Sequence, residues 1–199
     1  MAQGVINYSR EPMTRWKPDA AGRLVEAAIA LFEAQGYDET SVAEIAQRAG
    51  LTKRTFFRHF PDKREVLFAG SSQLVELWVD AVAAAPAGAP PIAAACAGFR
   101  PVGELFSGRF DVARVRARII EANPELMERE LRKLEALAGA VGAALAARGA
   151  HEGEAALAAQ SAVAVFRVGF SRWVLQGDPD ALTAQLDDAL DELRAVIAG

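Results

Sequence analysis

The sequence predicts an all-α protein, with a small three-helix unit at the N-terminus and a larger helical bundle at the C-terminus. Alanine dominates the composition and β-branched runs are short, which favours helix because alanine has the highest helix propensity. Apolar residues also recur at helical spacing in most segments between glycines and prolines. With 199 residues, 52% of them hydrophobic, the chain is long enough for one small and one larger domain.

The first helix is expected to begin after Asp19 and to end at Gln35, before Gly36. Aspartate is a favourable N-cap, and glycine readily adopts the positive φ that ends many helices. One face carries apolar residues at helical spacing, namely Leu24, Ala27, Ala28, Leu31 and Phe32. Residues 1–18, which precede this helix, lack periodicity and are expected to form a flexible arm.

Two short helices joined by a tight turn are expected next. Ser41 and Glu44 have the spacing of a capping box, so a helix begins after Ser41, and Gly50 ends it. Thr52 is the N-cap of a second, cation-rich helix, Lys53–His59. Helix, glycine-containing turn and basic second helix form the helix-turn-helix pattern, whose second helix enters the DNA major groove. The core of the three-helix unit is expected to be Phe32, Ile45, Phe56 and Phe60.

The charge distribution supports a DNA interface in this unit. Residues 47–64 carry the basic residues Arg48, Lys53, Arg54, Arg58, Lys63 and Arg64 against one acid, Asp62, although the whole chain has a net charge of −4. A local basic patch on an acidic protein is the electrostatic footprint of a confined phosphate-binding surface. The alternative is the solvated charged face of an ordinary helix hairpin.

A series of short motifs runs through the same stretch: Phe32, Gly36-Tyr37, Thr40-Ser41-Val42, Ile45-Ala46, Ala49-Gly50, Leu51-Thr52-Lys53, Phe56-Phe57, His59-Phe60 and Lys63. With these motifs, Arg23 to Leu67 resembles the TetR family of bacterial transcriptional regulators. The resemblance implies a DNA-binding domain over residues 19–65 and a helical ligand-binding and dimerisation domain over residues 66–199. It also implies a homodimer through the last two helices, which presents two recognition helices to a near-palindromic DNA operator.

By the same resemblance, the residues expected to contact DNA are Thr40, Ser41, Thr52, Lys53, Arg54, Thr55, Phe57, His59 and Lys63. Lys53 stands where family members contact a phosphate. Arg54 replaces the usual glycine or alanine, and its guanidinium can read guanine in a bidentate contact; a phosphate contact is the alternative. Phe57 replaces the usual tyrosine, which removes one expected hydrogen bond to phosphate. Basic residues of the arm, Arg10, Arg15 and Lys17, are expected to reach the minor groove or to belong to a disordered tail.

The remainder of the chain is expected to form the bundle. Six helices are predicted here. Their limits are Asp62–Ala84, Ile92–Phe106, a helix that begins at a cap on Asp111, a helix from Asn123-Pro124 to about Arg148, Glu152–Gln176, and a helix from Asp178-Pro179 to the end. The first of these connects the two domains. The last two carry more apolar surface than one bundle needs, which predicts a four-helix dimer interface.

Seven large aromatic residues of the bundle are candidates for a ligand site: Trp78, Phe99, Phe106, Phe110, Phe166, Phe170 and Trp173. Among alanines, spaced aromatic side chains can line a cavity for a small apolar or amphipathic effector, or they can simply fill the core. Arg167 and Arg172 are expected either to neutralise an acidic effector or to form a salt bridge across the dimer. The candidate partners of that salt bridge are Asp187, Asp188 and Glu192.

Several classes of site find no support in the sequence. Cys96 is the single cysteine, so an internal disulfide is impossible, and His59 and His151 fall in different predicted domains. We therefore expect no metal, cofactor or catalytic centre. A signal-peptide pattern and an apolar run of 18 residues are both missing, which predicts a cytoplasmic protein without a membrane partner.

The leading hypothesis is a TetR-like one-component regulator, a repressor released from its operator by a small molecule. One alternative is a helical DNA-binding protein without an effector. Another is a helical enzyme or interaction module.

Overall fold

The computed structural model describes residues 20–198, and the predicted arm and the Asp19 cap lie outside the described residues. Within this range the elements are α1 (Ala20–Gln35), α2 (Val42–Arg48), α3 (Lys53–His59), η1 (Glu65–Phe68), α4 (Ser71–Ala84), α5 (Pro91–Cys96), α6 (Phe99–Phe106), α7 (Phe110–Glu121), α8 (Pro124–Ala147), α9 (Glu152–Gln176) and α10 (Leu182–Ala198). The predicted all-α fold class is confirmed. Of these elements, η1 is a short 3₁₀ helix and the others are α-helices.

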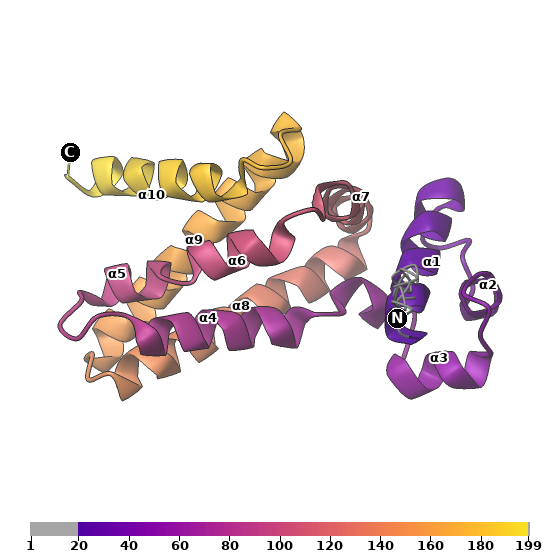
Figure 1. Cartoon of the computed structure of the whole chain (residues 1–199), viewed down its shortest axis with the longest axis horizontal. Helices are drawn as coiled ribbons and strands as arrows, with labels where there is room; N and C mark the ends of the chain where they lie inside the picture. The colour runs from indigo at the N-terminus through magenta and orange to yellow at the C-terminus, as the bar shows by residue number, and fades with distance from the viewer. Residues whose placement is uncertain (1–19, 199) are drawn as a thin grey trace, which may run out of the picture.

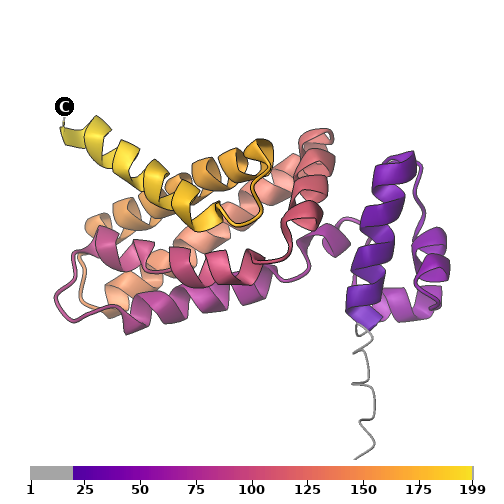
Figure 2. The ribbon, with the colours of Figure 1, turned by 45° about the horizontal axis from the view of Figure 1, so that its top comes forward.

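The molecule is elongated, with α1, α2 and α3 grouped at one end and the bundle at the other (Figure 1). Helix α7 and η1 lie between the two parts, so the connection after the DNA-binding unit runs beside α7. In a second view, the C-terminal end of α10 projects away from the rest of the bundle (Figure 2). This end carries Val196 and Ile197, both largely exposed.

The N-terminal unit has its own hydrophobic core. The four predicted core residues, Phe32, Ile45, Phe56 and Phe60, are all buried, and Phe32 also packs against the ring of Tyr37. The same cluster continues into η1, α7 and α8 through Val66, Leu67, Phe68, Ile119, Ile120 and Leu126. The core therefore extends past the boundary predicted at residue 65 and joins the two parts by burial of apolar side chains.

The connecting segment is not the single helix predicted from Asp62 to Ala84. It consists of η1 and α4, separated at Gly70, whose φ is 83°. A glycine adopts this φ at no steric cost, and the apolar periodicity on either side concealed the break. By length and composition, Glu65–Ala84 is apolar enough to cross a membrane, but its large side chains Leu67 and Trp78 are buried in the two protein cores.

Three further boundaries differ from the prediction. Helix α10, predicted to start at Asp178-Pro179, begins at Leu182. The segment expected as one helix over Ile92–Phe106 is divided into α5 and α6, because Pro101 has no N–H to continue the hydrogen-bond ladder. Helix α7 begins at Phe110, so Asp111 is not its cap. Asp111 lies in the first turn instead, where a negative charge is favourable beside the helix dipole.

The last two helices cross closely because α9 has a glycine at the crossing point. A Cβ atom on Gly169 would lie 2.8 Å from the Gln185 carbonyl oxygen and 2.8 Å from Leu186 Cδ2. Arg172 of α9 also forms two hydrogen bonds with Glu192 of α10, at 2.8 and 2.7 Å. Glu192 is one of the three partners predicted for Arg172, but the salt bridge lies within one chain.

Candidate DNA-binding interface

The predicted capping box at the start of α2 is present. The Ser41 hydroxyl accepts a hydrogen bond from the Glu44 N–H at 3.3 Å, and the Glu44 carboxylate accepts the Ser41 N–H at 2.8 Å. The side-chain hydroxyl of Ser41 also donates to Glu44 at 2.7 Å, and these bonds lower the pKa of Glu44. The Ser41 hydroxyl, predicted to contact DNA, is therefore used to begin the helix.

Helix α3 occupies the predicted residues Lys53–His59. The Thr52 hydroxyl accepts a hydrogen bond from the Thr55 N–H at 3.1 Å, and the two hydroxyls lie 3.0 Å apart. Gly50 provides the turn before it with a φ of 66°. The start of the second helix is thus fixed by local hydrogen bonds, which restricts the orientation of its first turn.

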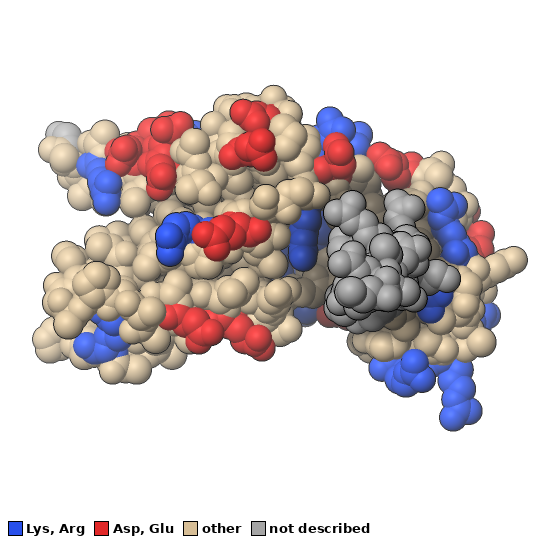
Figure 3. Space-filling model, viewed as in Figure 1, with Lys and Arg blue, Asp and Glu red and all other residues tan. Residues whose placement is uncertain are grey.

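The two faces of α3 differ sharply. Phe56 is fully buried in the core of the N-terminal unit, whereas Lys53, Arg54 and His59 are exposed, and Phe57 is 55% exposed. Figure 3 shows Lys and Arg side chains at the lower edge of the N-terminal unit, over α3. On the same face of the molecule the Asp and Glu side chains lie mostly over the bundle. The structure therefore brings together six of the predicted residues: Thr52, Lys53, Arg54, Thr55, Phe57 and His59.

Two of the predicted contact residues are placed differently. Thr40 is only 2% exposed, and its hydroxyl donates to the Gly36 carbonyl at 2.7 Å. The Lys63 ammonium donates to the carbonyls of Tyr37, Asp38 and Thr40 at 2.8, 3.2 and 3.2 Å, and lies 4.3 Å from the centre of the Tyr37 ring. Both side chains hold the loop between α1 and α2, so we correct the prediction that they face DNA.

One further residue of α3 belongs with the exposed group. Arg58 is exposed, and its guanidinium lies 3.5 Å from His59 Nε2. The family motifs do not include this position, but the count of basic residues between 47 and 64 does. Charge alone would therefore have identified Arg58.

A cluster of charged residues behind this interface fixes η1 to the bundle. Arg129 of α8 pairs with Glu65, and Arg116 of α7 donates from Nε to the Leu67 carbonyl at 2.5 Å. Both guanidinium groups lie over the ring of Phe68, at 5.2 Å for Arg116 and 4.8 Å for Arg129. The segment that follows the recognition helix is thus held from two helices of the bundle.

Behind Arg116, two ionisable groups of α8 are partly buried together. Glu130 accepts from Arg116 at 2.7 Å and from Lys133 at 2.6 Å. Burial would raise the pKa of Glu130, but the two cations outweigh this effect and lower it. Burial and the charge of Arg116 lower the pKa of Lys133 to about 8, in spite of its contact with Glu130.

The predicted ligand residues of the bundle mostly pack against one another. Six of the rings form a series in which each ring contacts the next. The distances between successive ring centres are Phe99–Trp78 5.6 Å, Trp78–Phe166 5.4 Å, Phe166–Phe170 5.6 Å, Phe170–Trp173 5.4 Å and Trp173–Phe110 5.1 Å. The Trp78 N–H is also satisfied, by the Ala95 carbonyl at 2.8 Å. These rings fill the core, which was the alternative to a cavity. Arg167 on α9 is exposed and is not among the residues that line the cavity described next, so we correct the prediction that it belongs to the candidate ligand site.

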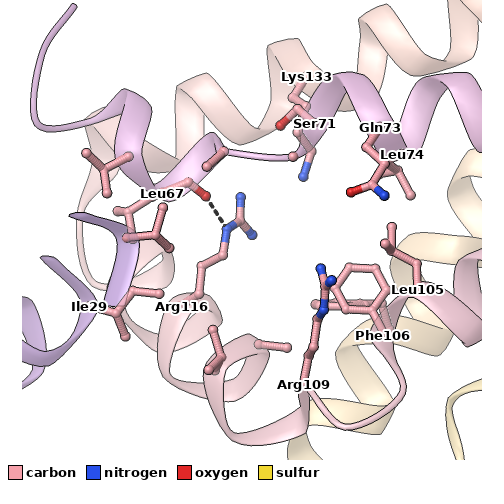
Figure 4. Close-up of a pocket in the computed structure, with 17 residues that line it drawn as sticks. Ile29, Leu67, Ser71, Gln73, Leu74, Leu105, Phe106, Arg109, Arg116 and Lys133 are labelled. Atoms are coloured by element: carbon pink, nitrogen blue, oxygen red, sulfur yellow. Dashed lines mark hydrogen bonds between the residues drawn. The ribbon is translucent and has the colours of Figure 1, made fainter. Parts of the chain in front are cut away.

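A cavity does exist, at the junction of the two parts. Its volume is about 180 Å³, and α1, η1, α4, α6, α7, α8 and α9 all contribute to its lining. Of the predicted ligand residues only Phe106 and Phe170 line it, together with Ile29, Leu67, Leu74 and Leu105. Figure 4 shows Arg109 and Arg116 directed into this space from the side of α7. Sequence reasoning missed it because the lining comes from seven separate elements.

The described part of the chain was also compared with the requirements of a metal site and of a reactive cysteine. Within residues 20–198, no group of three or more His, Cys, Asp and Glu side chains is placed to hold a metal ion. Cys96 packs against the bundle core, and burial raises the pKa of its thiol to about 11. The thiol is therefore protonated at neutral pH and behaves as a small apolar group.

Comparison with known proteins agrees with this geometry. Residues 24–69 match the family model of bacterial regulatory proteins of the tetR family, and residues 89–198 match that of the MftR C-terminal domain. The HTH-type transcriptional regulator TcmR of Streptomyces glaucescens is 34% identical over 208 aligned positions, which cover 92% of this chain and 91% of TcmR.

Solved structures share the fold. SmeT in its complex with triclosan has a TM-score of 0.60 at 18% identity and covers 88% of this chain and 91% of its own. A TetR-family protein of Mesorhizobium loti has a TM-score of 0.53 at 24% identity, covering 89% of this chain and 96% of its own. Together with the match to both family models and the near full-length relationship to TcmR, these findings show that the chain belongs to the TetR family of bacterial transcriptional regulators.

Proposed function

We propose that this regulator is a repressor that binds a near-palindromic operator as a homodimer in the cytoplasm and is released by a small-molecule effector. The observation that carries the proposal is the exposed face of α3, where Lys53, Arg54 and Arg58 lie on a helix held by its N-cap and by the buried Phe56. In helix-turn-helix proteins the first residues of the second helix contact base edges. Arg54 is the candidate for base recognition and Lys53 for a phosphate contact.

The apolar surface of the last two helices supports a homodimer. Leu157, Val168 and Leu175 on α9 are exposed, as are Val196 and Ile197 on α10, with fractions of 72, 42, 80, 80 and 75%. Soluble proteins rarely leave large apolar side chains gathered on neighbouring helices unless they meet a partner. A twofold dimer formed there would present two copies of α3 to two half-sites of DNA.

Release by an effector requires that a ligand bind the DNA-free conformation more tightly than the DNA-bound one. The junction cavity is suited to this, because Leu67 of η1 and Leu74 of α4 line it together with residues of α7. A ligand between these elements would change how the DNA-binding unit is held. SmeT, which shares the fold, is known in a complex with triclosan.

The test is selection of a binding sequence from random duplex DNA, followed by fluorescence-anisotropy titration of the full chain. We expect a near-palindromic site bound about a thousandfold or more tightly than random DNA at fixed salt. A screen of small molecules against the preformed complex should then yield a compound that raises the Kd for the selected site. If the chain binds DNA without sequence preference, the proposal that it is an operator-specific repressor is wrong.

One observation favours a second candidate function, a DNA-binding protein without an effector. The cavity of about 180 Å³ is smaller than the roughly 300 Å³ at which typical ligand pockets begin. A protein of this kind would bind the selected site, and no compound in the screen would release it. The two functions therefore differ in one measured quantity, the Kd for operator with and without the compound.

A further inference from the structure

We propose that the junction cavity binds an amphipathic organic anion, an acid carried on one or two rings, and that Arg109 and Arg116 bind its charged group. This inference deepens the proposed function, on which it rests, by assigning the chemical class of the effector. The cavity is defined above by its lining residues from α1, η1, α4 and α6 to α9.

The charge of the lining selects for an anion. Arg109, Arg116 and Lys133 all line the cavity, and no aspartate or glutamate is among its lining residues. Figure 4 shows the guanidinium groups of Arg109 and Arg116 entering the same space from the side of α7, with Lys133 on the side of α8. Such a convergence of cations favours a negatively charged group, since charge-assisted hydrogen bonds are the stronger ones.

The existing partners leave part of this positive charge uncompensated. Among the described residues, Glu130 is the one carboxylate that pairs with the cations of the lining, and it is shared by Arg116 and Lys133. Arg109 forms no ion pair with any residue in the range 20–198. Two positive charges thus remain beside an apolar wall, where a carboxylate from a ligand would be more strongly attracted than in water.

The apolar part of the cavity wall determines the body of the ligand. Leu74, Leu105, Phe106 and Phe170 line it, and the rings of Phe106 and Phe170 meet edge to face at 5.2 Å. A volume of about 180 Å³ is slightly larger than the roughly 150 Å³ of a cavity that holds one benzene. One or two fused rings fit this space, and the apolar wall discriminates against small hydrophilic anions such as phosphate.

Arg116 connects the cavity to the DNA-binding unit. Its Nε donates to the Leu67 carbonyl of η1, and its Nη2 donates to Glu130. A carboxylate in the cavity would compete with both acceptors for the same guanidinium. Ligand binding would therefore weaken the hold on η1, the segment that directly follows the helix-turn-helix, and so lower the affinity for DNA.

The experiment is calorimetric titration of the full-length chain, without DNA, with 2-naphthoate and with its neutral isostere 2-naphthamide. We expect naphthoate to bind at least about tenfold more tightly than naphthamide, and Arg109→Gln to reduce this preference, because one of the two guanidinium groups is then missing. Arg114→Gln is the matched control, because Arg114 lies on α7, close to Arg109 in the chain, but outside the cavity lining. Thermal unfolding verifies that each variant is folded.

Equal affinity for the acid and the amide, or an Arg109→Gln variant that behaves like Arg114→Gln, would overturn the assignment of an anion site. Absence of binding by either compound up to millimolar concentration would overturn it as well. Because Arg109 is exposed, Arg109→Gln is expected to fold, and it tests the anion site even if Arg116→Gln does not fold.

A second titration, of labelled operator, separates this inference from the proposed function. We expect naphthoate to raise the Kd for operator with the wild-type chain, and to raise it less at the same concentration with Arg109→Gln. Binding of naphthoate that leaves the operator Kd unchanged would overturn the coupling through Arg116. Failure of the wild-type chain to bind any DNA would refute the proposed function, whereas the calorimetric result would still stand for the anion site.

Discussion

Arg129 of α8 holds Glu65 of η1 through two parallel hydrogen bonds, with an Nε–Oε1 distance of 2.8 Å and an Nη2–Oε2 distance of 3.0 Å. Glu65 is the first residue of η1, which follows the recognition helix, so this pair ties the end of the DNA-binding unit to a long helix of the bundle. The side chains of Arg129 and Glu65 are 32% and 26% exposed. The paired geometry and partial burial make the contact stronger than an ordinary surface ion pair.

We predict a coupling free energy of roughly 1 kcal/mol between these two residues. The measurement is a double-mutant cycle with Glu65→Gln and Arg129→Gln, followed by urea unfolding. The control cycle uses Asp191 and Arg194, whose side chains are 73% and 65% exposed, and should give a coupling near zero. Equal coupling in the two cycles would mean that the Glu65–Arg129 pair does not fasten η1.

The two cations at the start of α3 are predicted to have different roles. Arg54→Ala should reduce the ratio of operator to random-DNA affinity by about tenfold or more, because a bidentate contact to guanine discriminates by roughly 1–3 kcal/mol. Lys53→Ala should weaken both affinities and reduce the slope of log K against log salt by about one for each phosphate that is no longer neutralised. Anisotropy titrations at several salt concentrations measure both quantities. An equal reduction of operator and random-DNA affinity for Arg54→Ala would reject its role in recognition.

Lys133 gives a prediction about pH. Its pKa is about 8 in the folded chain against 10.5 for an ordinary lysine, so between pH 8 and 10.5 the unfolded chain holds a proton that the folded chain has released. Stability rises with pH wherever the unfolded state binds more protons. The free energy of unfolding of the wild type, relative to that of Lys133→Met, should therefore increase over this window.

Urea unfolding of both proteins at intervals from pH 7 to 10.5 measures this difference. Arg132→Met is the control, since Arg132 is an exposed neighbour on α8 and arginine stays charged throughout. If this difference in unfolding free energy falls or stays constant as the pH rises, the pKa of Lys133 is not lowered in the folded chain, and the prediction is wrong.

Gly169 is predicted to be essential for the crossing of α9 and α10. Gly169→Ala should destabilise the fold by roughly 1–3 kcal/mol, because its Cβ would meet the Gln185 carbonyl and Leu186 at 2.8 Å. Gly153→Ala on the same helix has no atom within 4 Å of the new Cβ and should be neutral or stabilising. Thermal unfolding compares the two variants. A Gly169→Ala protein as stable as the wild type would show that the crossing can widen without cost.

How far the sequence predicted the structure depends on whether the cause is local. The limits of α2 and α3 were predicted closely, because Ser41, Glu44, Gly50 and Thr52 determine them through hydrogen bonds and a turn within a few residues. The division of the connecting segment at Gly70 was missed. A single glycine inside an apolar helical pattern does not reveal from sequence whether its φ is positive.

The candidate site was also predicted poorly where it depends on contacts between residues that are far apart in the chain. Thr40 and Lys63 belong to a family motif, yet Lys63 bonds to three carbonyls about 25 residues away in the chain, and no local pattern indicates this. The aromatic side chains of the bundle were correctly placed in its interior, but whether they leave space depends on side-chain packing. The junction cavity depends on Arg109 and Arg116 meeting α1 and η1, which only the tertiary arrangement brings about.

We propose that two copies of α3, presented by a dimer, read one DNA site. The most direct measurement is a stoichiometric titration of the selected near-palindromic duplex, and of a scrambled duplex of equal length and composition, with the full-length chain. We expect two protomers per selected duplex and an affinity at least about a thousandfold above that for the scrambled one at the same salt concentration. One protomer per duplex, or equal affinity for the two sequences, would contradict it.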